Sequence, residues 1–167
     1  MNAPAHGSTL EITEADLDCP PQQQAVLELL DAYAADPMGD GRSLSPEVRD
    51  RLIDGLRRHP TTLIFLAWRD RRAVGIAVCF LGFSTFHARS LINIHDLAVL
   101  PPYRGRRIGP RLLEAVAHKA RQLGCCKLTL EVQENNHRAR RLYEAAGFAQ
   151  VQYHQDAGGS LFYAKPL

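Results

Sequence analysis

The segment Tyr103-Arg104-Gly105-Arg106-Arg107-Ile108-Gly109-Pro110 constrains the fold of this chain more than any other. It lies between an apolar run at 91–100, typical of a strand, and an amphipathic run at 108–123, typical of a helix. The sequence therefore predicts a strand, a tight turn and a helix start. The first N–H groups of a helix have no partner within it and carry the positive end of its dipole, so this turn is suited to phosphate. Four arginines flank it: Arg104, Arg106, Arg107 and Arg111.

Two common phosphate-binding loops are missing from this turn. It has no Gly-Lys-Ser or Gly-Lys-Thr of a nucleoside triphosphate loop. It also has no Gly-x-Gly-x-x-Gly followed by the acidic residue of a dinucleotide site. A pyrophosphate loop of another kind remains, and the alternative is an ordinary loop with solvated arginines.

A second motif lies at 135–148, Asn-Asn-His-Arg-Ala-Arg-Arg-Leu-Tyr-Glu-Ala-Ala-Gly-Phe. Together the two segments resemble the GNAT superfamily of N-acetyltransferases, which use acetyl-coenzyme A. The first matches the signature Arg/Gln-x-x-Gly-x-Gly/Ala at Arg104 and Gly109. The second matches Asn-x-x-Ala-x-x-Leu-Tyr-x-x-x-Gly-Phe, and the resemblance covers about residues 63–165. The matching positions of the second motif are Asn136, Ala139, Leu142, Tyr143, Gly147 and Phe148.

The chain departs from the first signature at one position, where Arg107 replaces a glycine. If the backbone there needs a positive φ or a close approach to pyrophosphate, a side chain costs on the order of 1 kcal/mol. We expect the guanidinium charge of Arg107 to compensate.

Hydrophobic periodicity and turn residues predict strand, two helices, three strands, helix, strand, helix and two strands. The resemblance implies the same order. It implies an α/β (α+β) GNAT acyl-CoA N-acyltransferase fold, with a central mixed, mostly antiparallel sheet of about seven strands flanked by about four helices. The predicted strands are 10–13, 62–68, 73–83, 91–100, 127–132, 149–153 and 160–165; the helices are 20–35, one between Ser45 and Pro60, 108–123, and one from Asn136 to 145.

With 167 residues, the chain has the length of one domain, which we place at 9–167 after a flexible tail at 1–8. A net charge of +2 says almost nothing about partners, but the lack of interleaved aromatics and of a nucleic-acid-binding motif argues against a nucleic-acid partner, which stays a weak alternative. The longest apolar stretch, 73–83, is far shorter than a bilayer span, so we expect no membrane anchor. Residues 1–8 do not resemble a secretory signal, and a cytoplasmic location is expected.

The four cysteines, Cys19, Cys79, Cys125 and Cys126, include no Cys-x-x-Cys pair. Their spacing supports neither a disulfide framework nor zinc, and we expect reduced, packed thiols and no metal.

Acetyl transfer to an amine requires a base, because an alkyl ammonium with a pKa near about 10.4 must lose a proton before it attacks. His95 and Asp96 form a polar pair inside an apolar strand, shortly before the phosphate turn. Either side chain can take the proton, and Asp96 can instead orient His95 or hold a cationic substrate. Neighbours on a flat strand face apart, so both reach one substrate only if a bulge intervenes. Glu131 is a further candidate base. Satisfied core residues are the alternative interpretation of the pair.

The resemblance implies that Tyr143 is the general acid that protonates the leaving thiolate, and that Asn136 caps its helix and contacts the pantetheine arm. The strand that carries His95 and Asp96 can supply backbone N–H groups that polarise the thioester carbonyl. The predicted contacts to acetyl-CoA are therefore Leu97, Ala98, Val99, Arg104, Gly105, Arg106, Arg107, Ile108, Gly109, Pro110, Asn136 and Tyr143.

Two loops are predicted to bind the acceptor, at Tyr33, Asp36 and Asp40 and at Phe83 and Phe86. Acidic side chains there suit a cationic amine, such as a polyamine, an amino acid derivative or a lysine-like group. The sequence thus predicts direct transfer of an acetyl group from acetyl-CoA to a primary amine of a small molecule or peptide. The alternatives are an acyl-cysteine route and a non-catalytic acyl-CoA-binding regulatory module. The resemblance also suggests a homodimer.

Overall fold

The structure is a computed structural model that describes residues 9–151 and 163–166. The chain divides into two compact units, Met1–Gln133 and Glu134–Leu167. The tail predicted at 1–8 lies outside the described residues, and the single domain at 9–167 stays a prediction. The described elements of the first unit are β1 (Leu10–Glu14), α1 (Pro20–Ala34), α2 (Pro46–Arg58), β2 (Thr62–Arg69), β3 (Arg72–Ser84), β4 (Arg89–Val99), the 3-10 helix η1 (Pro101–Tyr103), α3 (Ile108–Gln122) and β5 (Leu128–Leu130). The second unit holds α4 (His137–Ala145).

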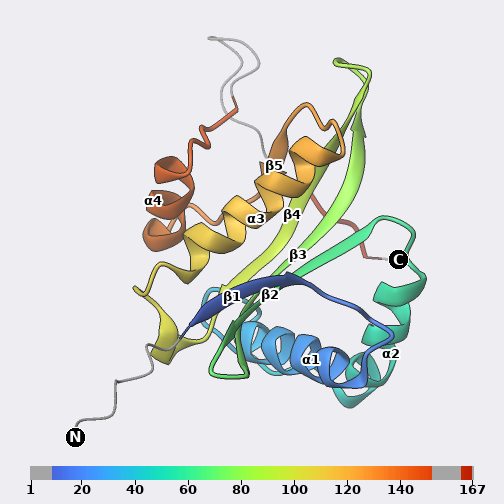
Figure 1. The fold of residues 1–167 in the computed structure, drawn as a ribbon, viewed down its shortest axis with the longest axis vertical. Coiled ribbons are helices and arrows are strands. Elements are labelled where there is room, and N and C mark those ends of the chain that lie inside the picture. Colours follow the sequence, from blue (N-terminus) through green and yellow to red (C-terminus); the bar gives the residue numbers. More distant parts are fainter. Residues whose placement is uncertain (1–8, 152–162, 167) are drawn as a thin grey trace, which may run out of the picture. The chain divides into compact units, whose positions relative to one another are not determined.

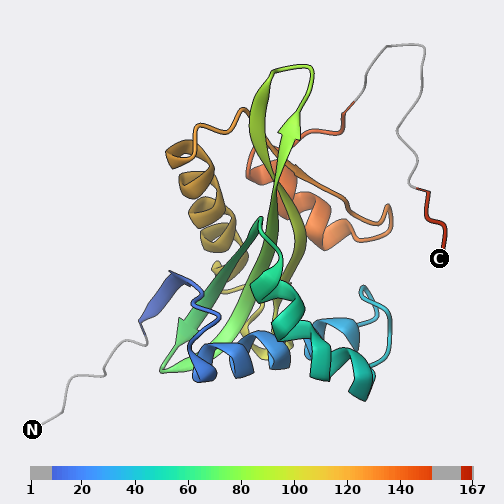
Figure 2. The same cartoon turned by 90° about the vertical axis from the view of Figure 1, so that its right-hand side faces the viewer.

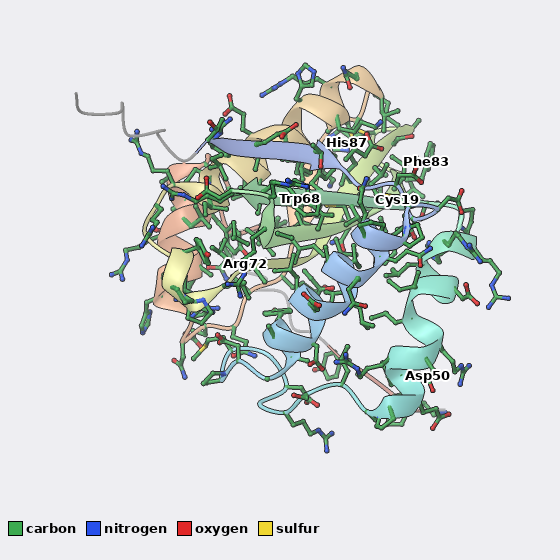
Figure 3. All side chains as sticks on the ribbon, turned by 60° about the horizontal axis from the view of Figure 1, so that its bottom comes forward. Cys19, Asp50, Trp68, Arg72, Phe83 and His87 are labelled. Carbon is green, nitrogen blue, oxygen red and sulfur yellow. The ribbon has the colours of Figure 1, made fainter. Side chains whose placement is uncertain are left out.

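In the described part of the first unit, the strands form a five-stranded sheet in the order β1-β2-β3-β4-β5 (Figure 1). The first four strands pair antiparallel with their sequence neighbours. Strand β5 joins β4 in parallel after the crossover through α3. The indole N–H of Trp68, labelled in Figure 3, donates to the Thr13 hydroxyl at 3.0 Å and so ties β2 to β1. The predicted mixed, mostly antiparallel sheet is confirmed.

The helices α1 and α3 cover opposite faces of this sheet (Figure 2). Side chains alternate along β3, so Ile76 and Val78 face α1 while Gly75 faces α3. On the α1 face, the buried core contains Val26, Leu29, Leu30, Ile64, Leu66, Ile76 and Val78. From α3, the buried side chains are Ile108, Leu112, Leu113, Val116 and Ala120. The apolar periodicity of 20–35 and 108–123 therefore marked both core layers.

Helix starts follow the capping residues that the sequence indicates. The Ser45 hydroxyl accepts the N–H of Val48 at 3.3 Å, and Pro46 occupies the first position of α2. The Asn136 side chain accepts the N–H of Ala139 at 3.1 Å at the start of α4. The cap predicted at Asn136 is confirmed.

The predicted number of about seven strands is too high for the described residues, which form five. The two strands predicted at 149–153 and 160–165 lie partly outside the described residues, and their described positions belong to no strand. Alternating side chains suit a strand, but a strand also needs a partner for its backbone groups, and alternation alone does not supply one.

Candidate active site

The predicted phosphate turn begins with η1 and ends where α3 starts at Ile108. Two of its residues have left-handed backbone, Gly105 with φ 75° and Arg107 with φ 61°. Position 107 therefore has the positive φ that favours glycine, but carries an arginine at a cost on the order of 1 kcal/mol. The turn keeps its shape despite this side chain.

Arg107 is the N-cap residue of α3, and its side chain does not cap the backbone donors of the first turn. This turn also contains no acidic residue. In contrast, side chains cap α2 and α4. Because Pro110 has no N–H, the donors of this first turn are the N–H groups of Ile108 and Gly109. These donors and the dipole of a 15-residue helix suit an anion.

Gly75 of β3 lets the start of α3 lie close to the sheet. A Cβ atom at this position would meet the Ala98 carbonyl oxygen at 3.1 Å and the Ile108 Cγ2 at 3.2 Å. Both distances are shorter than ordinary contacts, so a larger residue would push the helix start away from β4. The glycine thereby fixes the distance between the phosphate turn and β4.

The flanking arginines have different surroundings. Arg104 is held inside the unit: its Nε donates to the Val99 carbonyl at 2.9 Å, and its terminal nitrogen pairs with the Asp36 carboxylate at 2.5 Å. Arg106 and Arg72 lie 5.8 and 6.0 Å from the centre of the Tyr103 ring, and Figure 3 labels Arg72. Arg106 and Arg107 are exposed and remain available to an anion.

Arg104 and Asp36, predicted to contact cofactor and acceptor respectively, are therefore brought together as an ion pair. Their side chains are only 28% and 10% exposed. The other carboxylate oxygen of Asp36 accepts the N–H of Met38 at 2.9 Å. The pair thus links the end of β4 to the loop after α1, 68 residues away in sequence.

One edge of β4 is left without a strand partner in the described first unit. Strand β5 pairs with Ile92, Asn93 and Ile94 only, while β4 continues to Val99. The N–H of Leu100 donates to the carbonyl of Val74 in β3 at 2.9 Å. By alternation, the N–H groups of Leu97 and Val99 point to the open edge, and that of Ala98 points towards β3.

A β-bulge lies at the polar pair of β4. Asp96 pairs with Val78 and Ile94 pairs with Cys79, so His95 is the extra residue. The ring of His95 lies 5.5 Å from that of Phe80, which packs against the α1 core. The bulge interrupts the strict alternation of side chains at His95 and Asp96, which is the irregularity that the sequence argument called for, but of the two only Asp96 lines the pocket described below.

Burial dominates the electrostatics around Asp96. Desolvation raises the pKa of the Asp96 carboxyl, and the charge of His95 partly lowers it. The pKa of Tyr33 is raised by burial and then by the charges of Asp96 and Asp36. Burial and the Asp96 charge raise the pKa of Cys79 to about 12, so this thiol stays protonated. A carboxyl with a raised pKa is a better proton acceptor than an exposed one.

A pocket of about 380 Å³ opens beside this carboxyl. Its polar lining includes Tyr33, Asp40, Asp96 and Gln133. Its apolar lining includes Leu30, Ala34, Met38, Leu44 and Leu52. Sequence reasoning found Tyr33, Asp40 and Asp96. It missed Gln133 and the apolar residues, which carry no signal that distinguishes a pocket wall from a core.

The remaining acceptor candidates lie elsewhere. Phe83 and Phe86 are 64% and 88% exposed near the turn between β3 and β4 and do not line the pocket. Figure 3 shows Phe83 near His87 at this end of the sheet. Glu131 is exposed just after β5 and is also outside the pocket lining.

A larger cavity of about 590 Å³ lies beside α2, with His59 and Phe80 in its lining. It contains no predicted site residue and neither His95 nor Asp96. We therefore take the smaller pocket as the candidate acceptor site.

In the second unit, Tyr143 lies on α4, and its ring lies 5.9 Å from that of Phe148 in an edge-on arrangement. Asn136 serves as the cap of the same helix. Both motif residues therefore lie within a short, locally ordered segment.

The family model described as the acetyltransferase (GNAT) family matches residues 25–148. This range includes the bulge, the phosphate turn and α4, and the chain belongs to this family.

Known relatives align over part of their length. The thialysine N-epsilon-acetyltransferase of Bos taurus is 39% identical over 74 residues, which cover 44% of this chain and 43% of the relative. The aminoalkylphosphonate N-acetyltransferase of Salmonella typhimurium is 34% identical over 88 residues, which cover 53% and 57%. The chain thus spans about half the length of these relatives.

A solved aminoglycoside N-acetyltransferase in complex with CoA has the same fold, with a TM-score of 0.75 and 17% identity. The alignment covers 99% of this chain and 100% of that one. No helix among the described residues is long and apolar enough to span a membrane. The described part of the chain also contains no group of three or more His, Cys, Asp or Glu placed to bind a metal ion.

Proposed function

We propose that this protein is an acetyl-CoA-dependent N-acetyltransferase that transfers the acetyl group directly to a primary amine of a small molecule or peptide. One observation carries the proposal: within the first unit, an uncapped helix start adjoins an open strand edge, and the bulge of that strand places Asp96 at a pocket. The relatives named for acetylating thialysine and aminoalkylphosphonate support an amine acceptor.

The residues present fit the pyrophosphate of coenzyme A. The N–H groups of Ile108 and Gly109 are the donors, and the exposed guanidinium groups of Arg106 and Arg107 balance the charge. Arg104 supports the turn from inside through its bonds to Val99 and Asp36. The solved relative with bound CoA supports this cosubstrate. When bound, acetyl-CoA supplies the acetyl group as a thioester, whose C–S bond breaks as the new C–N bond forms.

Asp96 is the base that we favour. Asp96 lines the pocket. His95 is exposed, with its ring beside that of Phe80, and neither His95 nor Glu131 is part of the pocket lining. The carboxylate takes a proton from the ammonium of the acceptor, so that the nitrogen lone pair becomes available. The positive charge that His95 can carry helps to keep Asp96 ionised.

Three further groups act on the acetyl carbonyl and on the leaving sulfur. The N–H groups of Leu97 and Val99, which point to the open edge of β4, donate to the carbonyl oxygen as its negative charge grows. Tyr143 donates its phenolic proton to the thiolate. After attack, the nitrogen of the tetrahedral species still carries one proton too many, and the phenolate left on Tyr143 takes it up, so that the tyrosine is regenerated. These roles together account for the two protons that the nitrogen loses, for the proton that the thiolate gains and for the charge that develops on oxygen.

The test is release of thiol from acetyl-CoA in the presence of a panel of primary amines. Tyr143→Phe should lower kcat by about 100-fold or more and leave the affinity for CoA nearly unchanged. Tyr163→Phe is the matched control, because Tyr163 is an exposed tyrosine whose loss should not alter kcat.

Binding of acetyl-CoA without thiol release for any amine would overturn the enzymatic proposal and favour a regulatory acyl-CoA-binding module. Unchanged kcat in Tyr143→Phe would remove the general-acid role only. A homodimer and a cytoplasmic location stay predictions.

A further inference from the structure

The charges around the acceptor pocket are largely neutralised in pairs. Asp31 pairs with Arg49 at 2.8 Å, and its carboxylate also accepts the N–H of Leu44 in the pocket wall. Asp36 pairs with Arg104 beneath the same loop. Asp40, which lines the pocket, pairs with Arg42 at 2.8 Å. Three of the four carboxylates in this region therefore have an arginine partner.

Asp96 is the exception, since no ion pair among the described residues includes it. Apart from Asp40, whose partner is Arg42, the other polar groups of the lining are uncharged, namely the Tyr33 hydroxyl and the Gln133 amide. The pocket thus offers one carboxylate without an arginine or lysine partner, and His95, whose charge acts on Asp96, is not among the lining residues. A single ammonium group can be neutralised there, whereas a second has no such counter-charge.

The rest of the lining is apolar and the space is small. Leu30, Ala34, Met38, Leu44 and Leu52 come from α1, the following loop and α2. A volume of about 380 Å³ is near the lower end for ligand pockets. Burying a second charged group against these side chains would cost free energy without an ion pair in return.

We propose that the acceptor is a small monoamine, with one ammonium group on an apolar alkyl or arylalkyl body. This inference rests on the proposed function and narrows it. This inference excludes polyamines as acceptors. The acidic residues of this region suggest a polyamine only if their arginine partners are ignored. The specificity comes from Asp96 for the ammonium and from the leucine-rich wall for the body.

The test compares two acceptors of equal length, hexylamine and 1,6-diaminohexane, in the thiol-release assay. We expect kcat/KM to be about 10-fold or more higher for hexylamine, because its far end is apolar. Phenethylamine should also be acetylated. Equal or higher kcat/KM for 1,6-diaminohexane would overturn the inference and leave the proposed function intact. No thiol release with any amine would overturn both.

Gln133→Glu tests the charge argument within the pocket, because it adds a carboxylate with almost no change in shape. The ratio of kcat/KM for diamine over monoamine should rise about 10-fold in this variant. Arg42→Met, which frees Asp40 of its partner, should move the ratio in the same direction. Arg51→Met removes an arginine outside the pocket lining and serves as control. An unchanged ratio in both pocket variants would contradict the assignment of specificity to charge.

Discussion

The ion pair of Asp36 and Arg104 provides the most quantitative prediction for this structure. The variants Asp36→Asn and Arg104→Gln keep the approximate shapes of the side chains, and each removes one charge. Fully buried pairs lose about 3–5 kcal/mol when one partner is removed, because the other charge is left buried. The side chains are 10% and 28% exposed, so we expect about 3 kcal/mol for each single variant.

The two losses should not add, because the second substitution removes the charge that the first left unpaired. A double-mutant cycle in urea should therefore give a coupling free energy of about 1.5–3 kcal/mol. Each single variant should melt about 6–12 °C below the unmodified protein. The exposed pair of Asp40 and Arg42, with the same residue types and an N···O distance of 2.8 Å, is the matched control and should show a much smaller coupling than the buried pair.

The cycle also has a kinetic readout. Asp36 holds the N–H of Met38, a residue of the pocket wall, so each single variant should raise KM for the amine more than it lowers kcat. If the free energies of the two single variants add within about 0.5 kcal/mol, the linkage between β4 and the pocket wall would be refuted.

Three other substitutions or reactions test single groups. Burial raises the pKa of Asp96, so the folded state binds this proton more tightly than the unfolded state. Asp96→Asn should therefore raise Tm at pH 8, and this difference in Tm should shrink as the pH falls through the folded pKa towards about 3.9. The same variant should have a lower kcat. A lower Tm of the variant at pH 8 would contradict this. Arg107→Gly should weaken CoA binding about two- to fivefold through loss of an exposed charge, and stronger binding would show that the arginine is a defect in the turn. Cys79, with a pKa of about 12, should resist iodoacetamide in the folded protein at pH 8 and react after denaturation, as peptide mass spectrometry can show.

Local features of the fold could be predicted well from the sequence. Ser45 and Asn136 marked helix starts because a side-chain cap depends only on residues nearby in the chain. The positive φ at Arg107 and the bulge at His95 were foreseen as conditions that the chemistry would need, and both are present. The two strands predicted after residue 148 lie partly outside the described residues, and their described positions, 149–151 and 163–165, belong to no strand. Pairing of such segments depends on distant backbone groups, which local patterns do not specify.

The candidate site depended on contacts that sequence patterns do not encode. Arg104 matches the cofactor signature, yet its partner is Asp36, 68 residues earlier. Many carboxylates are available to any arginine, and only the folded chain selects one. Leu30 and Met38 line the pocket although their apolar character equally suits the core. Phe83 was expected to contact the acceptor, but the pairing of β3 with β4 carries it beyond the pocket lining.

The central claim is that backbone N–H groups at the start of α3 hold the pyrophosphate of coenzyme A. Amide NMR of the labelled protein tests it most directly, with acetyl-CoA, CoA and pantetheine, which lacks the pyrophosphate, as ligands. The account predicts that the amide signals of Ile108 and Gly109 shift with acetyl-CoA and with CoA, and hardly at all with pantetheine. Folded protein whose Ile108 and Gly109 signals stay unchanged at millimolar acetyl-CoA would contradict the account.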